Sequence, residues 1–132
     1  MFKEEPSNYN YDALARDGRT SWTGVRNPVA QKNLRSIRKG DRIFFYHTGN
    51  EKSVIGICRA GGDAYADPAD TSGKLFAVDV EPVKKLKSPV TLAAIKADRR
   101  FSTFVLTRVP RLSVMPVTDE EWTMIVEMSS GG

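Results

Sequence analysis

With 132 residues, 40% of them hydrophobic and 27% charged, the chain has the size and composition of one soluble globular domain. Its 20 basic and 16 acidic residues leave a net charge of +4, which suits an anionic partner only if the basic side chains gather on one face. The single cysteine, Cys58, excludes an intramolecular disulfide and a multi-cysteine metal site, and we therefore expect a reducing, cytoplasmic location and neither a metal nor another cofactor.

Two helices are predicted in the first forty residues, behind a strand that begins at Phe2 and looks cut short at its N-terminal end. The first helix is a short turn that Gly18 closes. The pair Asn27-Pro28 is typical of an N-cap followed by the first helical position. It predicts a second helix over 28–39, with a glycine as its terminator.

The middle of the chain is predicted to form a hairpin, a loop and another strand. Residues 42–47 and 53–60 are rich in β-branched and aromatic side chains, and the turn between them is short, so the two strands should pair antiparallel. The segment 61–73 holds too many Gly, Asp and Pro residues for regular structure and is long enough to suggest a functional loop. Residues 74–86 are predicted to form the next strand.

The last third is predicted to hold a short helix capped by Thr91, a strand over 111–117 and a C-terminal helix over 118–128. Thr118 and Glu121 fit a capping box at the start of that helix. Because the hairpin connection is too short for parallel βαβ units, the pattern favours a single α+β domain over residues 1–132. Its sheet is expected to be curved and barrel-like, with short helices at its flanks.

The sequence offers little for catalysis. It has one histidine and one cysteine, no metal-binding spacing and no glycine-rich phosphate loop between a strand and a helix. His47 with Glu5 is the one combination that could supply a general base, so an enzyme acting on nucleic acid or a nucleotide stays as an alternative.

Binding offers more, although each signal also has an ordinary structural explanation. Trp22 is expected in a turn, either as a half-buried core residue or as a platform on which a base stacks, worth about 1–3 kcal/mol. Asn27 could read a base edge or could only cap its helix, and His47 at a strand end is more often structural than a ligand. Basic side chains on and near the second helix either face solvent or contact phosphates: Arg26, Lys32, Arg35, Arg38 and Lys39.

Six segments together resemble one family, the EVE domain. In chain order they are "KEEP", "SWTGVRN", "KNLRSIRKGDRIFFYHTGN", "DAYADP", "KSPVTLAAIKAD" and "RLSVMPVTDEEW". The EVE domain belongs to the PUA-like superfamily and is related to the YTH domains, which read methylated adenine in RNA. The resemblance covers nearly the whole chain and implies a PUA-like curved β-barrel sheet flanked by short helices.

The resemblance also implies a function: recognition of a modified nucleobase in DNA or RNA, enclosed as a flipped-out base in an aromatic and polar pocket, without catalysis. Trp22 matches a cage tryptophan, and Tyr65 in the 61–73 loop is where a second wall would come from. Glu5 is expected to accept a hydrogen bond from an exocyclic amine, which favours cytosine or adenine. The other residues expected at the pocket are Glu4, Tyr9, Thr23, Asn27, His47 and Thr48.

The implied partner is a nucleic acid that carries a modified base, bound by a monomer. No apolar run approaches the roughly 20 residues that a membrane-spanning helix needs, so no membrane partner is expected. A structural or protein-interaction domain is a further alternative, which gains weight if Trp22 is buried without a cavity beside it.

Overall fold

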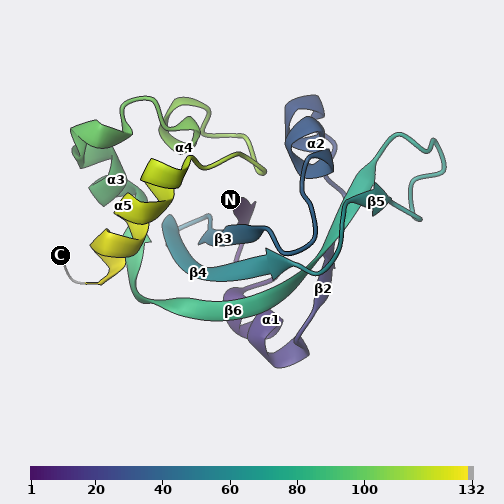
Figure 1. The fold of residues 1–132 in the computed structure, drawn as a ribbon, viewed down its shortest axis with the longest axis horizontal. Coiled ribbons are helices and arrows are strands. Elements are labelled where there is room, and N and C mark those ends of the chain that lie inside the picture. Colours follow the sequence, from purple (N-terminus) through teal and green to yellow (C-terminus); the bar gives the residue numbers. More distant parts are fainter. Residues whose placement is uncertain (131–132) are drawn as a thin grey trace.

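The computed structural model describes residues 1–130, and its strands form a mixed sheet that curls into a half-barrel (Figure 1). The strands are β1 (Phe2–Glu4), β2 (Thr20–Trp22), β3 (Arg42–His47), β4 (Ser53–Ala60), β5 (Tyr65–Ala66) and β6 (Phe76–Thr91). The helices are α1 (Tyr11–Asp17), α2 (Pro28–Arg35), α3 (Leu92–Ala97), α4 (Val105–Arg108) and α5 (Asp119–Ser129), with a short 3-10 helix over Arg99–Phe101. In Figure 1, α1 lies below the sheet and the other helices lie above it. None of the helices in residues 1–130 is long and apolar enough to cross a membrane.

The long strand β6 organises the sheet, whose order is β1-β3-β4-β6-β2 with β5 paired to β6 outside this path. The strand predicted over 74–86 is β6, which continues to Thr91. The predicted loop 61–73 is irregular except for the short strand β5. The register of β4 shifts against both of its neighbours, β3 and β6. Such irregularities bend strands and increase their twist, so the sheet closes toward a barrel. The predicted α+β class with a curved sheet is confirmed.

Side-chain caps begin the helices where the sequence predicts them. The Asn27 side chain accepts hydrogen bonds from the first two free backbone N–H groups of α2, at 2.9 and 3.1 Å. Thr91 caps α3 in the same way. Thr118 and Glu121 exchange both bonds of a capping box at the start of α5. These contacts satisfy N–H groups that have no partner within their own helix.

The second helix is shorter than predicted, because α2 ends at Arg35 and not at residue 39. Beyond it the backbone N–H of Arg38 donates to the Asp41 carboxylate, and that of Gly40 donates to the carbonyl of Ala60. These bonds tie the chain to its own turn and to β4, which draws it away from the helix axis.

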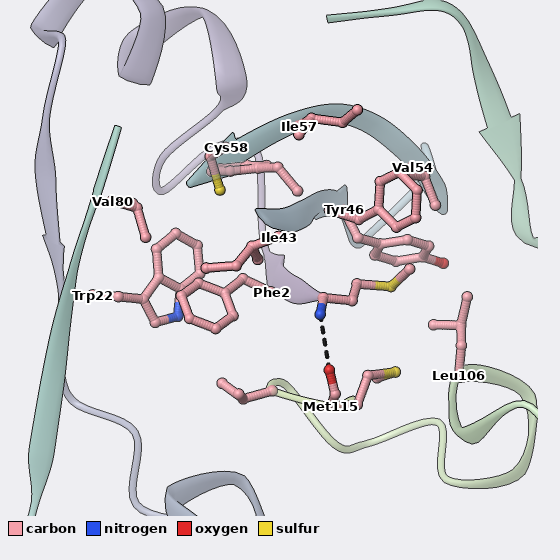
Figure 2. Close-up of a cluster of buried hydrophobic side chains, with 14 of the residues drawn as sticks. Phe2, Trp22, Ile43, Tyr46, Val54, Ile57, Cys58, Val80, Leu106 and Met115 are labelled. Atoms are coloured by element: carbon pink, nitrogen blue, oxygen red, sulfur yellow. Dashed lines mark hydrogen bonds between the residues drawn. The ribbon is translucent and has the colours of Figure 1, made fainter. Parts of the chain in front are cut away.

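The predicted strand over 111–117 is wrong. A single bridge between Phe2 and Val114 is its only β pairing within residues 1–130. The backbone N–H of Met115 donates to the Met1 carbonyl, and the α-amino group of Met1 donates to the Met115 carbonyl at 2.8 Å, dashed in Figure 2. Burial lowers the pKa of that amino group to about 5. The segment is therefore held against β1 without a regular ladder.

Hydrophobic core residues pack against both faces of β3. On one face, Trp22 at the end of β2 packs with its ring centroid 4.8 Å from that of Phe2 and 5.5 Å from that of Phe45. Figure 2 shows Trp22 and Phe2 side by side within this cluster. On the other face, Phe44 stacks on Trp122 of α5 with a centroid distance of 3.8 Å. Trp22 thus lies in a strand and in the core, whereas the sequence placed it in a turn.

Candidate nucleic-acid interface

Two of the expected pocket residues, Glu4 and Glu5, stand where β1 ends beside the end of β3. The strands are parallel, Glu4 is paired with His47, and the Thr48 N–H donates to the Glu4 carbonyl at 2.9 Å. The Glu5 carboxylate lies against Gly49 and 3.4 Å from the Thr48 hydroxyl. Neither carboxylate forms an ion pair within residues 1–130. The fold therefore brings Glu4, Glu5 and Thr48 together and leaves Glu5 with unused acceptor capacity.

His47 lies beside this group but is occupied by structural contacts. Its side chain is buried, its Nε2 accepts from the backbone N–H of Tyr11 at 3.1 Å, and its Nδ1 is 2.5 Å from the Glu51 carboxylate. With both ring nitrogens engaged, the imidazole is held in one orientation, with the hydrogen on Nδ1. It joins the start of α1 to the turn between β3 and β4, and no hydrogen bond joins it to Glu5 in the described part of the chain.

Trp22 is 7% exposed, so its ring is not an open platform. The rings of Phe2 and Phe45 cover it, which matches the core alternative. Its indole N–H has no hydrogen-bond partner among the described residues. Every wholly buried side-chain nitrogen or oxygen in residues 1–130 has a partner, so the indole nitrogen is not wholly buried. The indole nitrogen consequently keeps some contact with solvent, while Trp22 does not line the groove beside α2 (Pro28–Arg35).

The two expected tyrosines both bond to carboxylates, and Tyr65 lies on the opposite face of the sheet from Trp22. The Tyr9 hydroxyl donates to Asp17 at 2.9 Å. The Tyr65 hydroxyl is 2.5 Å from Asp79 and 3.3 Å from the hydroxyl of Ser21. Because neighbouring side chains of a strand point to opposite faces, Ser21 and Tyr65 lie on the face of the sheet that Trp22 does not occupy. Tyr65 therefore does not form a wall opposite Trp22.

Asn27 lines a groove beside the first turn of α2, with a volume of about 420 Å³. The groove runs between α2 and the chain from α4 to residue 116. Val29 and Val109, which are 56% and 47% exposed, are two of the three large hydrophobic side chains exposed among the described residues, and both line it. The full lining, mostly apolar, is Asn27, Val29, Asn33, Val105, Val109, Arg111, Leu112 and Pro116. We call this cavity the α2 groove.

The polar side chains of the α2 groove keep unused hydrogen-bonding capacity. The Asn27 carbonyl oxygen caps the helix, while its NH₂ group has no partner in residues 1–130. The Asn33 NH₂ group donates to the Val114 carbonyl at 2.9 Å, which leaves its oxygen as an acceptor. Arg111 forms no ion pair within the same range. The groove thus offers a donor, an acceptor and a cation beside an apolar wall.

Most residues of the α2 groove were not predicted from the sequence. Val29 lies off the apolar stripe of its helix. An apolar residue at such a position is expected to be exposed, and this was the one sequence signal that pointed to an apolar surface here. Val109 and Arg111 belong to a segment predicted in part as a strand, so their position opposite α2 could not be foreseen.

The side chains expected to contact phosphates are exposed and lie on or next to α2: Arg26, Lys32, Arg35, Arg38 and Lys39. None of them forms an ion pair within residues 1–130. The Arg35 guanidinium lies 5.6 Å from the centroid of the Phe76 ring, and Arg38 donates to two backbone carbonyls. Thr23 is also exposed.

Comparison with known proteins places the chain in a family. The sequence model of the EVE domain matches residues 1–128. The chain belongs to the EVE domain family. The resemblance drawn from its motifs is confirmed, and so is the PUA-like half-barrel that the resemblance implies.

Solved structures of EVE relatives share this fold closely. A protein from Rhodopseudomonas palustris is 43% identical, with a TM-score of 0.94 over 98% of this chain and 91% of that chain. The human THYN1 protein, in a crystal structure in complex with 5-methylcytosine containing DNA, is 26% identical, with a TM-score of 0.89 over 97% of this chain and 95% of that chain.

Curated relatives extend beyond the matched region. Thymocyte nuclear protein 1 of Homo sapiens is 28% identical over an alignment that covers 83% of this chain and 59% of that protein. The chain spans less than two thirds of the length of such relatives.

Proposed function

We propose that this chain is a binding module that recognises a modified nucleobase in DNA or RNA and performs no chemistry on it. The observation that carries the proposal is the human THYN1 protein, which has the same fold over 97% of this chain and was crystallised with 5-methylcytosine containing DNA. Membership of the EVE domain family over residues 1–128 supports the same function.

The α2 groove is the proposed base site, because an apolar cavity with a few polar groups is the usual make-up of a small-ligand pocket. The Asn27 NH₂ group can donate to a ring nitrogen or carbonyl oxygen of a base, and the Asn33 oxygen can accept from an exocyclic amine. That pair matches the edge of cytosine. A methyl group on the base would lie against Val29 or Val109, where its burial contributes about 0.8 kcal/mol, or about fourfold in affinity.

Trp22 is proposed to contribute through its indole N–H, because its ring faces are covered by the core. Glu5 lies beside Thr48 and does not line the α2 groove, so its predicted role as the acceptor of an exocyclic amine belongs to the alternative in which the base binds beside Thr48. The exposed cations on and near α2 are proposed to contact backbone phosphates, as neutralised phosphates supply much of the affinity for nucleic acid.

Binding is favoured over catalysis by the surroundings of His47. A general base needs a nitrogen free to take the substrate proton, and both imidazole nitrogens are engaged, one by the Tyr11 N–H and one by Glu51. The combination of His47 with Glu5, considered above as a catalytic pair, has no hydrogen bond in the described residues.

Substitution of the two exposed valines tests the base site. Matched oligonucleotides that differ only in one 5-methylcytosine are titrated at one stated salt concentration. We expect the wild type to prefer the methylated strand by about threefold to tenfold. The double variant Val29→Ser, Val109→Ser should lose this preference at unchanged stability, while Val126→Ser on α5, outside the groove, should keep it.

Two results would overturn these proposals in different ways. If the double variant keeps the full preference, the base lies elsewhere. If the wild type binds no oligonucleotide, the proposed function fails and a structural or protein-interaction domain becomes the better account. The monomeric state and the cytoplasmic location stay predictions, which sedimentation and cell fractionation test.

A further inference from the structure

A second cavity, of about 280 Å³, lies on the other side of α4 from the α2 groove. Val105 and Val109 line the groove, whereas Leu106 and Pro110 line this cavity. We call it the lysine pocket, after three of its lining residues. The full set is Lys3, Tyr46, Thr48, Gly49, Lys52, Leu92, Lys96, Leu106 and Pro110.

The three lysines reach this pocket from separate parts of the chain. Lys3 comes from β1, Lys52 from the turn between β3 and β4, and Lys96 from α3. None of them forms an ion pair within residues 1–130. Three cations around one cavity repel one another, and a bound anion would relieve this repulsion.

Lys3 is the most constrained of the three because its side chain is half-buried. Its Nζ donates to the Pro110 carbonyl at 2.6 Å and lies 5.6 Å from the centroid of the Tyr46 ring. An ammonium has three N–H donors, and within residues 1–130 the Pro110 carbonyl is the one protein acceptor of Lys3 Nζ. Partial burial also lowers the pKa of Lys3. A half-buried ammonium with donors to spare fits a site that a charged acceptor completes.

Lys52 has an unusual backbone conformation at the edge of this pocket. Its backbone φ is +41°, and no other non-glycine residue within 1–130 has a positive φ. The left-handed region is unfavourable for a residue with a long side chain, and Gly or Asn adopts it more easily. Asparagine is thus a substitution that removes the ammonium group of Lys52 without adding backbone strain.

One acidic group opposes an anion in this pocket. The Glu5 carboxylate touches two lining residues, since it lies against Gly49 and 3.4 Å from the Thr48 hydroxyl. Its charge should weaken anion binding without preventing it, because three cations face one carboxylate. Removing the Glu5 charge should therefore strengthen anion binding, whereas removing a lysine should weaken it.

We infer that the lysine pocket binds a phosphate group, held by the ammonium groups of Lys3, Lys52 and Lys96. The inference rests on the proposed function only for the source of the phosphate: the backbone of the strand whose base enters the α2 groove on the other side of α4. A free phosphate monoester or inorganic phosphate has the same chemistry, and the arms of the experiment separate these sources.

The test combines two probes with matched lysine variants of the whole chain. Inorganic phosphate is titrated while the NMR amide signals of Tyr46, Thr48 and Gly49 are followed, and an oligonucleotide is titrated over a range of salt. In Lys52→Asn, Lys96→Gln, each lost lysine should lower the affinity for phosphate about threefold to tenfold. The oligonucleotide salt dependence should flatten by about one unit of slope. Glu5→Gln should raise the phosphate affinity.

Lys87→Gln, which removes an exposed lysine on β6 outside the pocket, is the control and should change the affinity less than about twofold. Lys52→Asn alone should melt no lower than the wild type, because asparagine accepts the left-handed conformation. This readout separates lost binding from lost folding. Equal losses in the pocket variant and in Lys87→Gln would overturn the inference.

The outcomes also distinguish this inference from the proposed function. If phosphate shifts the pocket signals but no oligonucleotide binds, the pocket stands with free phosphate as its ligand and the proposed function fails. If an oligonucleotide binds and neither phosphate nor the pocket variants have any effect, the proposed function stands and the lysine pocket is not a phosphate site.

Discussion

Replacing Trp22 by alanine should destabilise the whole domain, not only its ligand site. The side chain is 7% exposed and packs against the rings of Phe2 and Phe45 at 4.8 and 5.5 Å. A buried aromatic side chain removes about 150–250 Å² from water, which corresponds to about 4–6 kcal/mol at 25 cal/mol per Å². Truncations of this kind cost about 3–5 kcal/mol, against a total stability of about 5–15 kcal/mol for a typical domain.

Urea unfolding followed by circular dichroism measures this loss, and Trp22→Phe is the matched control. Phenylalanine keeps most of the ring contacts and should cost less than about 2 kcal/mol. It also removes the indole N–H, so oligonucleotide affinity should fall by about threefold to tenfold at nearly full folding. A Trp22→Ala protein as stable as the wild type would refute the burial argument and return Trp22 to the role of an exposed stacking platform.

Three further predictions follow from the same structure. Gly56→Ala should lower the free energy of unfolding by about 1–3 kcal/mol, because a Cβ there would come within 2.6 Å of the buried Tyr11 ring. Gly62→Ala is the control and should be neutral, because a Cβ there meets nothing within 4 Å. The midpoints of urea unfolding measure both changes. Burial raises the pKa of the Cys58 thiol from 9.0 to about 12, so the unfolded chain loses this proton first as the pH rises above 9. The free energy of unfolding should then fall between pH 9 and 12, and the fall should be smaller in Cys58→Ala. Reversing Arg35 and Arg38 to glutamate should weaken oligonucleotide binding uniformly across sequences and flatten its salt dependence, whereas a loss for one sequence alone would show that they read bases.

Local sequence signals predicted the parts of the fold that depend on neighbouring residues. Asn27 begins α2, the box of Thr118 and Glu121 begins α5, and the strands 42–47 and 53–60 form the expected hairpin. Contacts distant in sequence decided the rest. Trp22 lies in a strand because β2 pairs with the start of β6, more than fifty residues away.

The candidate site was less predictable for the same reason. The resemblance to the EVE domain implied that Glu4, Glu5 and Thr48 belong to one pocket, and the parallel pairing of β1 with β3 explains why they meet. It could not show that both nitrogens of His47 are engaged, since one partner is a backbone N–H of α1. Nor could it reveal the lysine pocket, because its three lysines converge only when β1, the hairpin turn and α3 are folded together.

The most direct test of the central claim is the affinity ratio of the wild-type protein for two oligonucleotides of the same sequence, one with 5-methylcytosine and one with cytosine, at a single stated salt concentration. Burial of the methyl group against the exposed valines of the α2 groove predicts tighter binding of the methylated strand by about threefold to tenfold. Equal affinity for the two strands, or no measurable binding of either, would contradict the account.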